Sequence, residues 1–175
     1  MKLFNKSDVQ DILHRSSSNY ASLHLDLIKS NAQYSYNYAC GISPRILTDI
    51  EDVISNDPKY AYLYAFNCLN HSRFELGEEV ISKSSIYSYM YAFGCLKSKF
   101  ELGEPAIANS AMMAYEYALN VLCGAFELGE PELAKDEFYA AKYTQNVLKS
   151  DFILNNVLIC EFNDALEPFI FPQHN

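Results

Sequence analysis

The sequence predicts an all-α fold, an α-solenoid of about five stacked two-helix repeats with a capping element at each end. Phenylalanine recurs at a strict 26-residue interval, and leucine follows two places later each time; the phenylalanines are Phe74, Phe100, Phe126 and Phe152. Three of these stations read Phe-Glu-Leu-Gly-Glu, at 74–78, 100–104 and 126–130. A fixed period of 20–50 residues is typical of a chain built by stacking one small unit.

The chain has 175 residues, a length that suits one domain. Within this domain, 1–175, we expect an N-terminal cap at 1–19, repeats at 20–162 and a C-terminal tail at 163–175. The segment Ser7-Asp-Val-Gln10 has the pattern of a capping box and opens a short helix in the cap. The tail is apolar and interrupted by proline, so it either folds back over the last repeat or offers a docking peptide.

The first element of each repeat is a tyrosine-rich segment such as 87–96, which matches 60–69 and continues at 113–122 and 139–148. The alternation Tyr-x-Tyr-x-Tyr favours a strand, but a helical projection places Tyr87, Tyr91 and Cys95 on one face of a wide apolar sector. We therefore predict a helix of about three turns. Small residues recur where neighbouring helices approach closely: Ala39, Ala65, Ala92 and Ala118. The narrow remaining sector is expected to face water and holds Met90, Glu116 and Lys142.

The second element is a helix of one to two turns, as in Gly103-Glu104-Pro105 and Gly129-Glu130-Pro131. Proline suits the first helical position, and the acid lies at the positive end of the helix dipole. The glycine station reads Asn155 in the last unit, which predicts a left-handed backbone there. Residues 152–162 are expected to form a terminal repeat.

Composition narrows the function classes. The net charge of −9 disfavours direct binding to nucleic acid or an anionic membrane. Five cysteines without disulfide-like spacing indicate a reducing compartment, and Cys68 and Cys95 fit small buried apolar positions. The N-terminus lacks a signal-peptide core, and no apolar run approaches the roughly 20 residues that span a bilayer. We expect a soluble cytoplasmic protein.

The string Phe-Glu-Leu-Gly-Glu-Pro-x-Ile-Ala, clearest at 100–108 and 126–134, resembles short tandem repeats in proteins of tailed bacteriophages and large DNA viruses. Glu79 replaces the proline in the preceding unit. The resemblance covers about three quarters of the chain. It implies an α-helical repeat fold and a viral origin, which would place the protein in the host cell cytoplasm. It implies no catalytic residue.

No residue pattern predicts catalysis, a metal site or a cofactor. The four histidines are His14, His24, His71 and His174, and no two have the i, i+4 spacing of a helical metal pair. Dinucleotide-binding, phosphate-binding and nucleophile-elbow motifs do not occur in the sequence. We therefore expect a protein that is not an enzyme.

The repeated glutamates are the candidate partner-binding residues. Stacked units would align Glu75, Glu101 and Glu127 in one row, and a second row would hold Glu78, Glu104 and Glu130, with Glu116 nearby. These acids either supply helix N-terminal charge and solubility, or form a ridge that docks a basic surface and imitates nucleic-acid phosphates.

The tyrosines are expected to be structural, with the ring in the core and the hydroxyl bonded at its edge, or else to line a concave groove. A small cluster of basic residues raises a second possibility, in which the protein holds a small anionic, nucleotide-like ligand. The candidate residues for that ligand are Arg73, Lys97, Lys99, Tyr62, Tyr89 and Tyr115.

The leading hypothesis from the sequence is a non-enzymatic binding protein whose acidic, tyrosine-rich surface engages a host protein with a basic surface. A viral origin extends this hypothesis to inhibition of a host defence system. The alternative is sequestration of the anionic ligand. The sequence assigns no oligomeric state.

Overall fold

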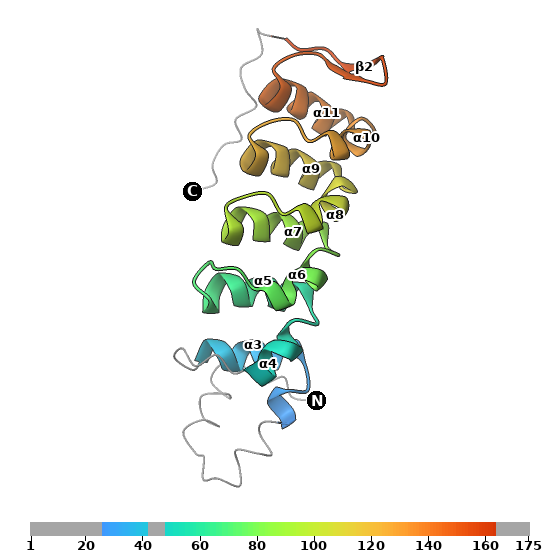
Figure 1. The fold of residues 1–175 in the computed structure, drawn as a ribbon. Coiled ribbons are helices and arrows are strands. Elements are labelled where there is room, and N and C mark those ends of the chain that lie inside the picture. Colours follow the sequence, from blue (N-terminus) through green and yellow to red (C-terminus); the bar gives the residue numbers. More distant parts are fainter. Residues whose placement is uncertain (1–25, 42–47, 164–175) are drawn as a thin grey trace. The chain divides into compact units, whose positions relative to one another are not determined.

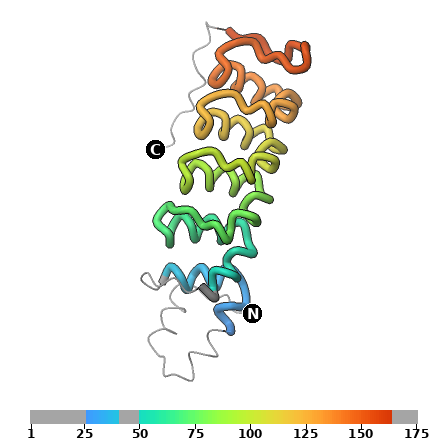
Figure 2. The backbone as a smooth tube through the Cα atoms, in the orientation of Figure 1, coloured from blue at the N-terminus to red at the C-terminus, as the bar shows by residue number. Residues whose placement is uncertain are grey.

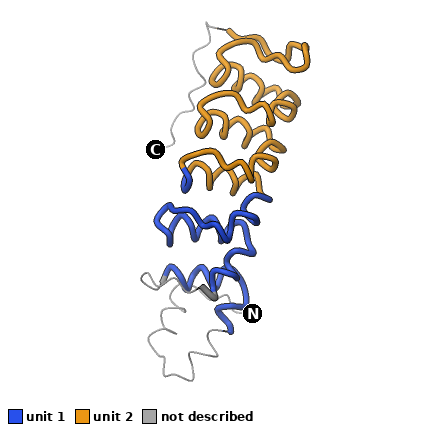
Figure 3. The backbone as a smooth tube through the Cα atoms, in the orientation of Figure 1, with its two compact units in different colours: residues 1–83, 94–96 blue, residues 84–93, 97–175 orange. Residues whose placement is uncertain are grey.

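The computed structural model describes residues 26–41 and 48–163. The predicted N-terminal cap at 1–19 and all but the first residue of the predicted tail lie outside these ranges. The chain divides into two compact units (Figure 3), each described by itself below. Unit 1 comprises Met1–Lys83 and Gly94–Leu96, and unit 2 comprises Ser84–Phe93 and Lys97–Asn175.

The elements of unit 1 in its described part are helices joined by short turns. Its elements are α3 (Ala32–Gly41), α4 (Thr48–Ile54), α5 (Pro58–Leu63), the π-helical η1 (Tyr64–Cys68) and α6 (Glu75–Ile81). Helix α3 packs on α4, α5 and η1, and α6 packs on α4 and α5. Asp57 caps α5 by accepting hydrogen bonds from the backbone N–H groups of Lys59 and Tyr60, and Pro58 follows at the first helical position.

In unit 2, long and short helical elements alternate along the chain (Figures 1 and 2). The long elements pair α7 (Ser85–Tyr91) with η2 (Ala92–Leu96), α9 (Ala111–Tyr117) with η4 (Ala118–Leu122), and α11 (Glu137–Tyr143) with η6 (Thr144–Leu148). The last three residues of η2, Gly94–Leu96, are counted with unit 1. The short elements are η3 (Glu101–Gly103) with α8 (Glu104–Ala108), and η5 (Glu127–Gly129) with α10 (Glu130–Leu133). Helix α9 contacts both α7 and α11, so successive long helices lie side by side in this unit.

The described chain is mostly helical, so the all-α prediction is confirmed in its broad form. The predicted helix of about three turns is confirmed at 85–96, 111–122 and 137–148, where Tyr-x-Tyr is helical. Pro105 and Pro131 lie in the first turn of α8 and α10, as predicted. Ala65, Ala92 and Ala118 are fully buried, as expected for close approach, whereas Ala39 is half-buried.

The last repeat differs from the prediction. Residues 152–162 were expected to form a terminal repeat, but β1 (Phe152–Leu154) and β2 (Val157–Cys160) pair there as an antiparallel hairpin. Asn155 and Asn156 connect the strands with φ of 52° and 63°. Two left-handed residues between strands match the twist that favours a tight hairpin, and asparagine tolerates that backbone. Phe152 keeps its station and is buried.

Each long element that contains a π segment changes from α-helix to π-helix along its length. An α-helical segment of six or seven residues is followed by five residues of π-helix. The wider hydrogen-bond ring appears in the bonds from the Leu69 N–H to the Tyr64 carbonyl (3.0 Å) and from the Lys149 N–H to the Thr144 carbonyl (2.9 Å). In unit 2 the π segments end at left-handed residues, Lys97, Cys123 and Lys149.

The recurring glycine is required for a different reason from the one predicted. Gly103 and Gly129 have φ of −90° and −88°, so the expected left-handed backbone is wrong for them, and Gly77 also lacks a positive φ. A Cβ on Gly129 would lie 2.6 Å from Cδ1 of Phe126 and 2.7 Å from the Ala114 Cβ. Glycine is needed because the short element presses against the preceding long helix.

The sector expected to face water is only partly exposed. Lys142 has 5% of its surface exposed, and its Nζ lies 4.8 Å and 5.0 Å from the ring centroids of Tyr115 and Phe138. The aromatic faces attract the ammonium group, and this attraction partly replaces its hydration by water. Met90 and Glu116, at the equivalent positions, are half-buried. The expectation of a water-facing side chain is therefore wrong for Lys142.

No helix in the described ranges is both long enough and apolar enough to cross a bilayer.

Candidate partner-binding surface

The repeated glutamates separate into two groups by exposure. The outer glutamates, Glu75, Glu101 and Glu127, are exposed at the first position of α6, η3 and η5. The inner glutamates, Glu78, Glu104 and Glu130, are half-buried three residues later. The sequence placed both groups in the candidate surface on equal terms, and the structure separates them because one short helical turn brings the second acid back toward the core.

In unit 2 the inner glutamates bind buried tyrosine hydroxyls. The Tyr117 hydroxyl donates to Oε1 of Glu104 (2.9 Å), and the Tyr143 hydroxyl donates to Oε1 of Glu130 (3.0 Å). Each hydroxyl also accepts a backbone hydrogen bond, Tyr117 from the N–H of Phe100 (2.9 Å) and Tyr143 from that of Phe126 (2.8 Å). These carboxylates therefore complete a buried hydrogen-bond network.

The remaining inner glutamate, Glu78 in unit 1, pairs with an arginine. The guanidinium of Arg73 donates to both of its carboxylate oxygens, at 2.7 Å and 3.0 Å. The fork geometry makes this a bidentate pair. Tyr64, which corresponds in sequence to Tyr117, donates its hydroxyl to Oε1 of Glu51 at 2.7 Å. This bond has the same 13-residue spacing as those of Tyr117 with Glu104 and Tyr143 with Glu130, and its acid comes from α4.

The aromatic rings of these tyrosines have the same neighbour in each repeat. Tyr64 meets Phe74 edge to face with ring centroids 5.0 Å apart, and Tyr117 meets Phe126 at 5.1 Å. Tyr91 with Phe100 and Tyr143 with Phe152 repeat the geometry at 5.2 Å and 5.4 Å. The four evenly spaced phenylalanines therefore have like surroundings, and each is buried. The structural role predicted for the tyrosines is confirmed at these positions.

The same network changes how the tyrosines titrate. Burial raises the pKa of Tyr117 and Tyr143 well above the usual value, and the neighbouring Glu104 and Glu130 carboxylates raise it further. Burial also raises the pKa of Tyr64, with Glu51 adding to the effect. The neutral hydroxyl is the form that the network requires, because only that form can donate to a carboxylate.

The leucine that follows each outer glutamate is exposed. Leu76, Leu102 and Leu128 have 51%, 55% and 54% of their surface exposed, although the phenylalanine two places earlier is buried each time. In unit 2, η5, which holds residues 127–128, contacts α8, the helix that directly follows residues 101–102. We call Glu101, Leu102, Glu127 and Leu128 the outer patch of unit 2.

Within the outer patch, the carboxylate of Glu101 is paired with the ammonium group of Lys99. The Lys99 ammonium lies 2.6 Å from Oε1 of Glu101, and this hydrogen bond holds the pKa of the carboxyl below its usual value. Both groups are exposed, so the pair is screened by water and salt. Glu127 is also exposed in the neighbouring repeat.

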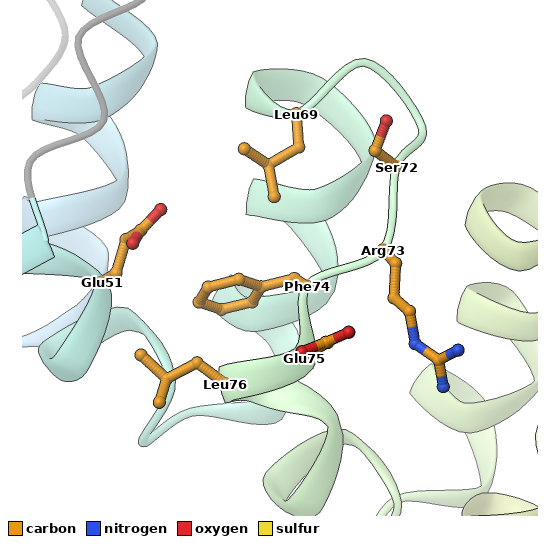
Figure 4. A pocket seen from close by; sticks show the side chains of 7 residues that line it. All are labelled: Glu51, Leu69, Ser72, Arg73, Phe74, Glu75 and Leu76. Carbon is orange, nitrogen blue, oxygen red and sulfur yellow. The ribbon is translucent and has the colours of Figure 1, made fainter.

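Unit 1 has an open pocket of about 830 Å³ at the corresponding station (Figure 4). Leu69, Phe74 and Leu76 point toward the space beside Glu51, whereas Arg73 points away from it. Ser72 and Glu75 complete the lining. The pocket therefore combines an apolar wall with carboxylates, the same pairing as in the outer patch of unit 2.

Glu116, the last of the predicted partner-binding acids, is engaged within its own helix. Its Oε2 accepts a hydrogen bond from Nδ2 of Asn120 at 2.8 Å. The same amide group donates to the Tyr89 hydroxyl at 3.2 Å, and Asn146 donates to Tyr115 at 2.8 Å. These bonds join long elements of successive repeats, so Tyr89 and Tyr115 have structural partners.

The residues predicted to hold a small anion are divided between the units. Arg73 and Tyr62 belong to unit 1, and Lys97, Lys99, Tyr89 and Tyr115 belong to unit 2. Arg73 and Lys99 are engaged by Glu78 and Glu101, and the rings of Tyr62 and Tyr115 are buried.

Metal-ligating side chains do not gather in the described ranges: no group of three or more histidine, cysteine, aspartate or glutamate residues could hold an ion there.

Sequence reasoning missed the exposed leucines. Their 26-residue recurrence was visible, but hydropathy alone predicts that a leucine near a recurring phenylalanine is a second core residue. The spacing of the two residues could have revealed the exposure. A phenylalanine and a leucine two positions apart at the start of a helix cannot lie on the same face.

Comparisons with models of protein families, with curated proteins and with solved structures found no match for this chain.

Proposed function

We propose that this chain is an α-solenoid of about five repeats that acts, without catalysis, by binding a protein partner through its outer glutamates and the leucines beside them. The observation that carries the proposal is the exposure of Leu76, Leu102 and Leu128, each more than half exposed at the same station. A single exposed leucine is ordinary, whereas an exposed leucine that recurs at the same repeat position in both units marks that position as a candidate contact.

Energetics support binding at this station. Apolar surface removed from water contributes about 25 cal/mol per Å², so a partner that covers several leucines gains affinity from each one. The outer glutamates flank those leucines and are free of the buried network that engages Glu104 and Glu130. Apolar contact supplies binding energy, and the carboxylates favour a partner of opposite charge.

The partner that fits this surface is a protein segment that carries lysine or arginine beside apolar side chains. The pocket of unit 1 has the same character, because Leu69 and Leu76 lie beside Glu51 and Glu75 (Figure 4). The net charge of −9 adds attraction for a basic segment at longer range. It also disfavours nucleic acid as the direct partner.

The resemblance of the Phe-Glu-Leu-Gly-Glu repeat to repeats of bacteriophages and large DNA viruses extends the proposal. The protein would then be a viral inhibitor that occupies a component of host defence in the host cytoplasm. The basic, apolar segment is the part of that component expected to contact the outer patch.

The test uses a partner captured from an expressing host and identified, then measured against variants by calorimetry. Leu102→Ser with Leu128→Ser is expected to weaken binding at least tenfold, and Glu101→Lys with Glu127→Lys to weaken it and reduce its salt dependence. Matched controls are Met112→Ser and Glu137→Lys, which change an exposed methionine and an exposed acid elsewhere in unit 2.

Partner affinity that survives both double variants would overturn the assignment of the outer patch. Glu104 and Glu130 are left unchanged in this design because their replacement would disturb buried tyrosines. Circular dichroism of each variant confirms that its helices are retained.

A further inference from the structure

Two cysteines of unit 1 meet where successive long elements pack. Cys40 lies in the last turn of α3, and Cys68 is the last residue of η1. Helix α3 contacts η1, and the two Sγ atoms lie 2.7 Å apart. Neither residue is in a disulfide bond in the structure. The helices therefore hold two sulfur atoms in direct contact without a covalent bond.

The pairing is peculiar to this pair of repeats. Cys68 and Cys95 hold equivalent positions, since each ends a Tyr-Ala-Phe-x-Cys string. The residue equivalent to Cys40 is Phe66 in the next repeat, because both follow Tyr-Ala. Cys95 accordingly has no thiol in the place that Cys40 takes for Cys68; it is buried, and burial raises its pKa to about 11. The chain therefore contains a built-in control for the pair.

We propose that Cys40 and Cys68 are a redox modification site whose substrate is a low-molecular-weight disulfide such as glutathione disulfide. Cys40 is the exposed member, and Cys68 is half-buried behind it. This arrangement provides an accessible attacking thiol and a resolving thiol already in contact with it.

The reaction balances as two exchange steps. The Cys40 thiolate attacks one sulfur of the small disulfide, which breaks the sulfur–sulfur bond, forms a mixed disulfide and releases one small thiolate. The Cys68 sulfur, on losing its proton to solvent, then attacks the Cys40 sulfur, which forms the protein disulfide and releases the second small thiolate. The protein loses two electrons and two protons, and the small disulfide is reduced to two thiols.

The electrostatics of the pair agree with this order. The hydrogen bond to Cys40 raises the pKa of Cys68, and burial raises it further. Cys68 is therefore held as a thiol until the proton that it shares with Cys40 is removed. Attack on the small disulfide is consequently assigned to the exposed residue.

The disulfide would join α3 to η1 and close a loop that contains α4 and α5. Cross-linking restricts the unfolded chain, so the oxidised protein is expected to unfold at a higher temperature than the reduced one. The modification would thus stiffen the packing of successive long elements in unit 1, and a small thiol would reverse it.

The test treats the full chain with glutathione disulfide at about pH 8, where thiolates are accessible, then blocks free thiols and maps peptides by mass spectrometry. The expected result is a peptide pair linked through Cys40 and Cys68, a mass loss of two hydrogen atoms, and a thermal midpoint raised by several degrees. Added dithiothreitol reverses all three changes. The control variant Cys95→Ala with Cys123→Ser and Cys160→Ser is expected to behave the same way.

Cys68→Ser separates the two steps, because the mixed disulfide on Cys40 can no longer resolve and glutathione remains attached. Glutathione that persists on Cys40 when Cys68 is intact, or a linked peptide that joins any other cysteine pair, would overturn the proposal. A protein that acquires neither linkage under these conditions would overturn it as well.

Discussion

At the residue scale, Tyr117 and Tyr143 each join three parts of unit 2. The ring meets the following phenylalanine, and the hydroxyl joins an inner glutamate to the backbone of an earlier loop. Both side chains are fully buried. A buried hydroxyl that accepts one hydrogen bond and donates another provides partners for a backbone N–H and a carboxylate that water does not reach.

Tyr143→Phe is expected to lower the free energy of unfolding by about 1–3 kcal/mol, because the buried N–H of Phe126 loses its acceptor. Urea denaturation measures the change. Tyr139→Phe is the matched control, since Tyr139 is half-buried in the same helix and its hydroxyl has no hydrogen bond among the described residues. Equal effects of the two substitutions would contradict the role of the Tyr143 hydroxyl.

The raised pKa values of Tyr64, Tyr117 and Tyr143 predict a loss of stability in alkali. Above the unfolded value of about 10, the unfolded chain releases the tyrosine protons while the folded chain keeps them. The unfolded state therefore binds fewer protons, and stability falls by up to about 1.4 kcal/mol per pH unit for each tyrosine. Stability from these groups is fully present below pH 10 or so.

Urea unfolding at pH values from about 8 to 11 measures this dependence, and Tyr143→Phe is expected to make the decline shallower. Stability that is level or rising across this range would be inconsistent with protonated, buried tyrosines. The Tyr139→Phe control should retain more of the wild-type slope than Tyr143→Phe.

At the element scale, the short helical element packs so tightly on the preceding long helix that its glycine has no room for a side chain. Gly129 approaches α9 at Ala114, and Gly103 approaches α7 at Ser88. Close approach of the two backbones brings the buried phenylalanine at the start of the short element under the tyrosine ring. The outer glutamate and leucine consequently remain on the opposite, exposed side.

Gly129→Ala is expected to destabilise the protein by about 1–3 kcal/mol, because the new methyl group would overlap Phe126 and Ala114. Gly124→Ala is the control: its Cβ would lie 3.9 Å from the Leu122 carbonyl oxygen, the nearest atom, so it is expected to be neutral or slightly stabilising. Thermal and urea unfolding compare the two variants. An equal destabilisation by both substitutions would contradict crowding as the reason for glycine at position 129.

At the scale of the whole molecule, the proposed solenoid predicts that complete repeats can be removed without loss of folding. Deletion of 103–128 removes one full period and restores the sequence Phe-Glu-Leu-Gly-Glu-Pro across the junction. The shortened chain is expected to keep its helical circular dichroism per residue and to unfold cooperatively at a lower temperature, because each repeat contacts its neighbours alone.

Deletion of 103–115, half a period, is the matched control and should abolish cooperative unfolding, because it joins a short element to the middle of a long one. A full-period deletion that unfolds the chain as completely as the half-period deletion would contradict the repeat architecture. Size-exclusion chromatography of both proteins separates folded from aggregated chains.

Much of the local fold could be predicted because the signals repeat. The proline in the first turn of α8 and α10 and the helical Tyr-x-Tyr segments depend on near neighbours in the chain. The hairpin at 152–160 could not be predicted from the repeat, since Phe152 keeps its station while Asn155 and Asn156 turn the chain. The candidate acids could be named from the sequence, but nothing in a uniform Glu-Leu-Gly-Glu string separates the exposed glutamate from the half-buried one.

The sequence alone determined the 26-residue period, the helical character and the acidic charge of this protein, because these properties are set by residue type and spacing. Tertiary structure alone decided which glutamate binds a tyrosine, that Leu102 and Leu128 face solvent, that Lys142 lies among aromatic rings, and that Cys40 meets Cys68. The physical reason is that each of these outcomes depends on the packing of one helix against another, and residues up to 31 positions apart then share a contact.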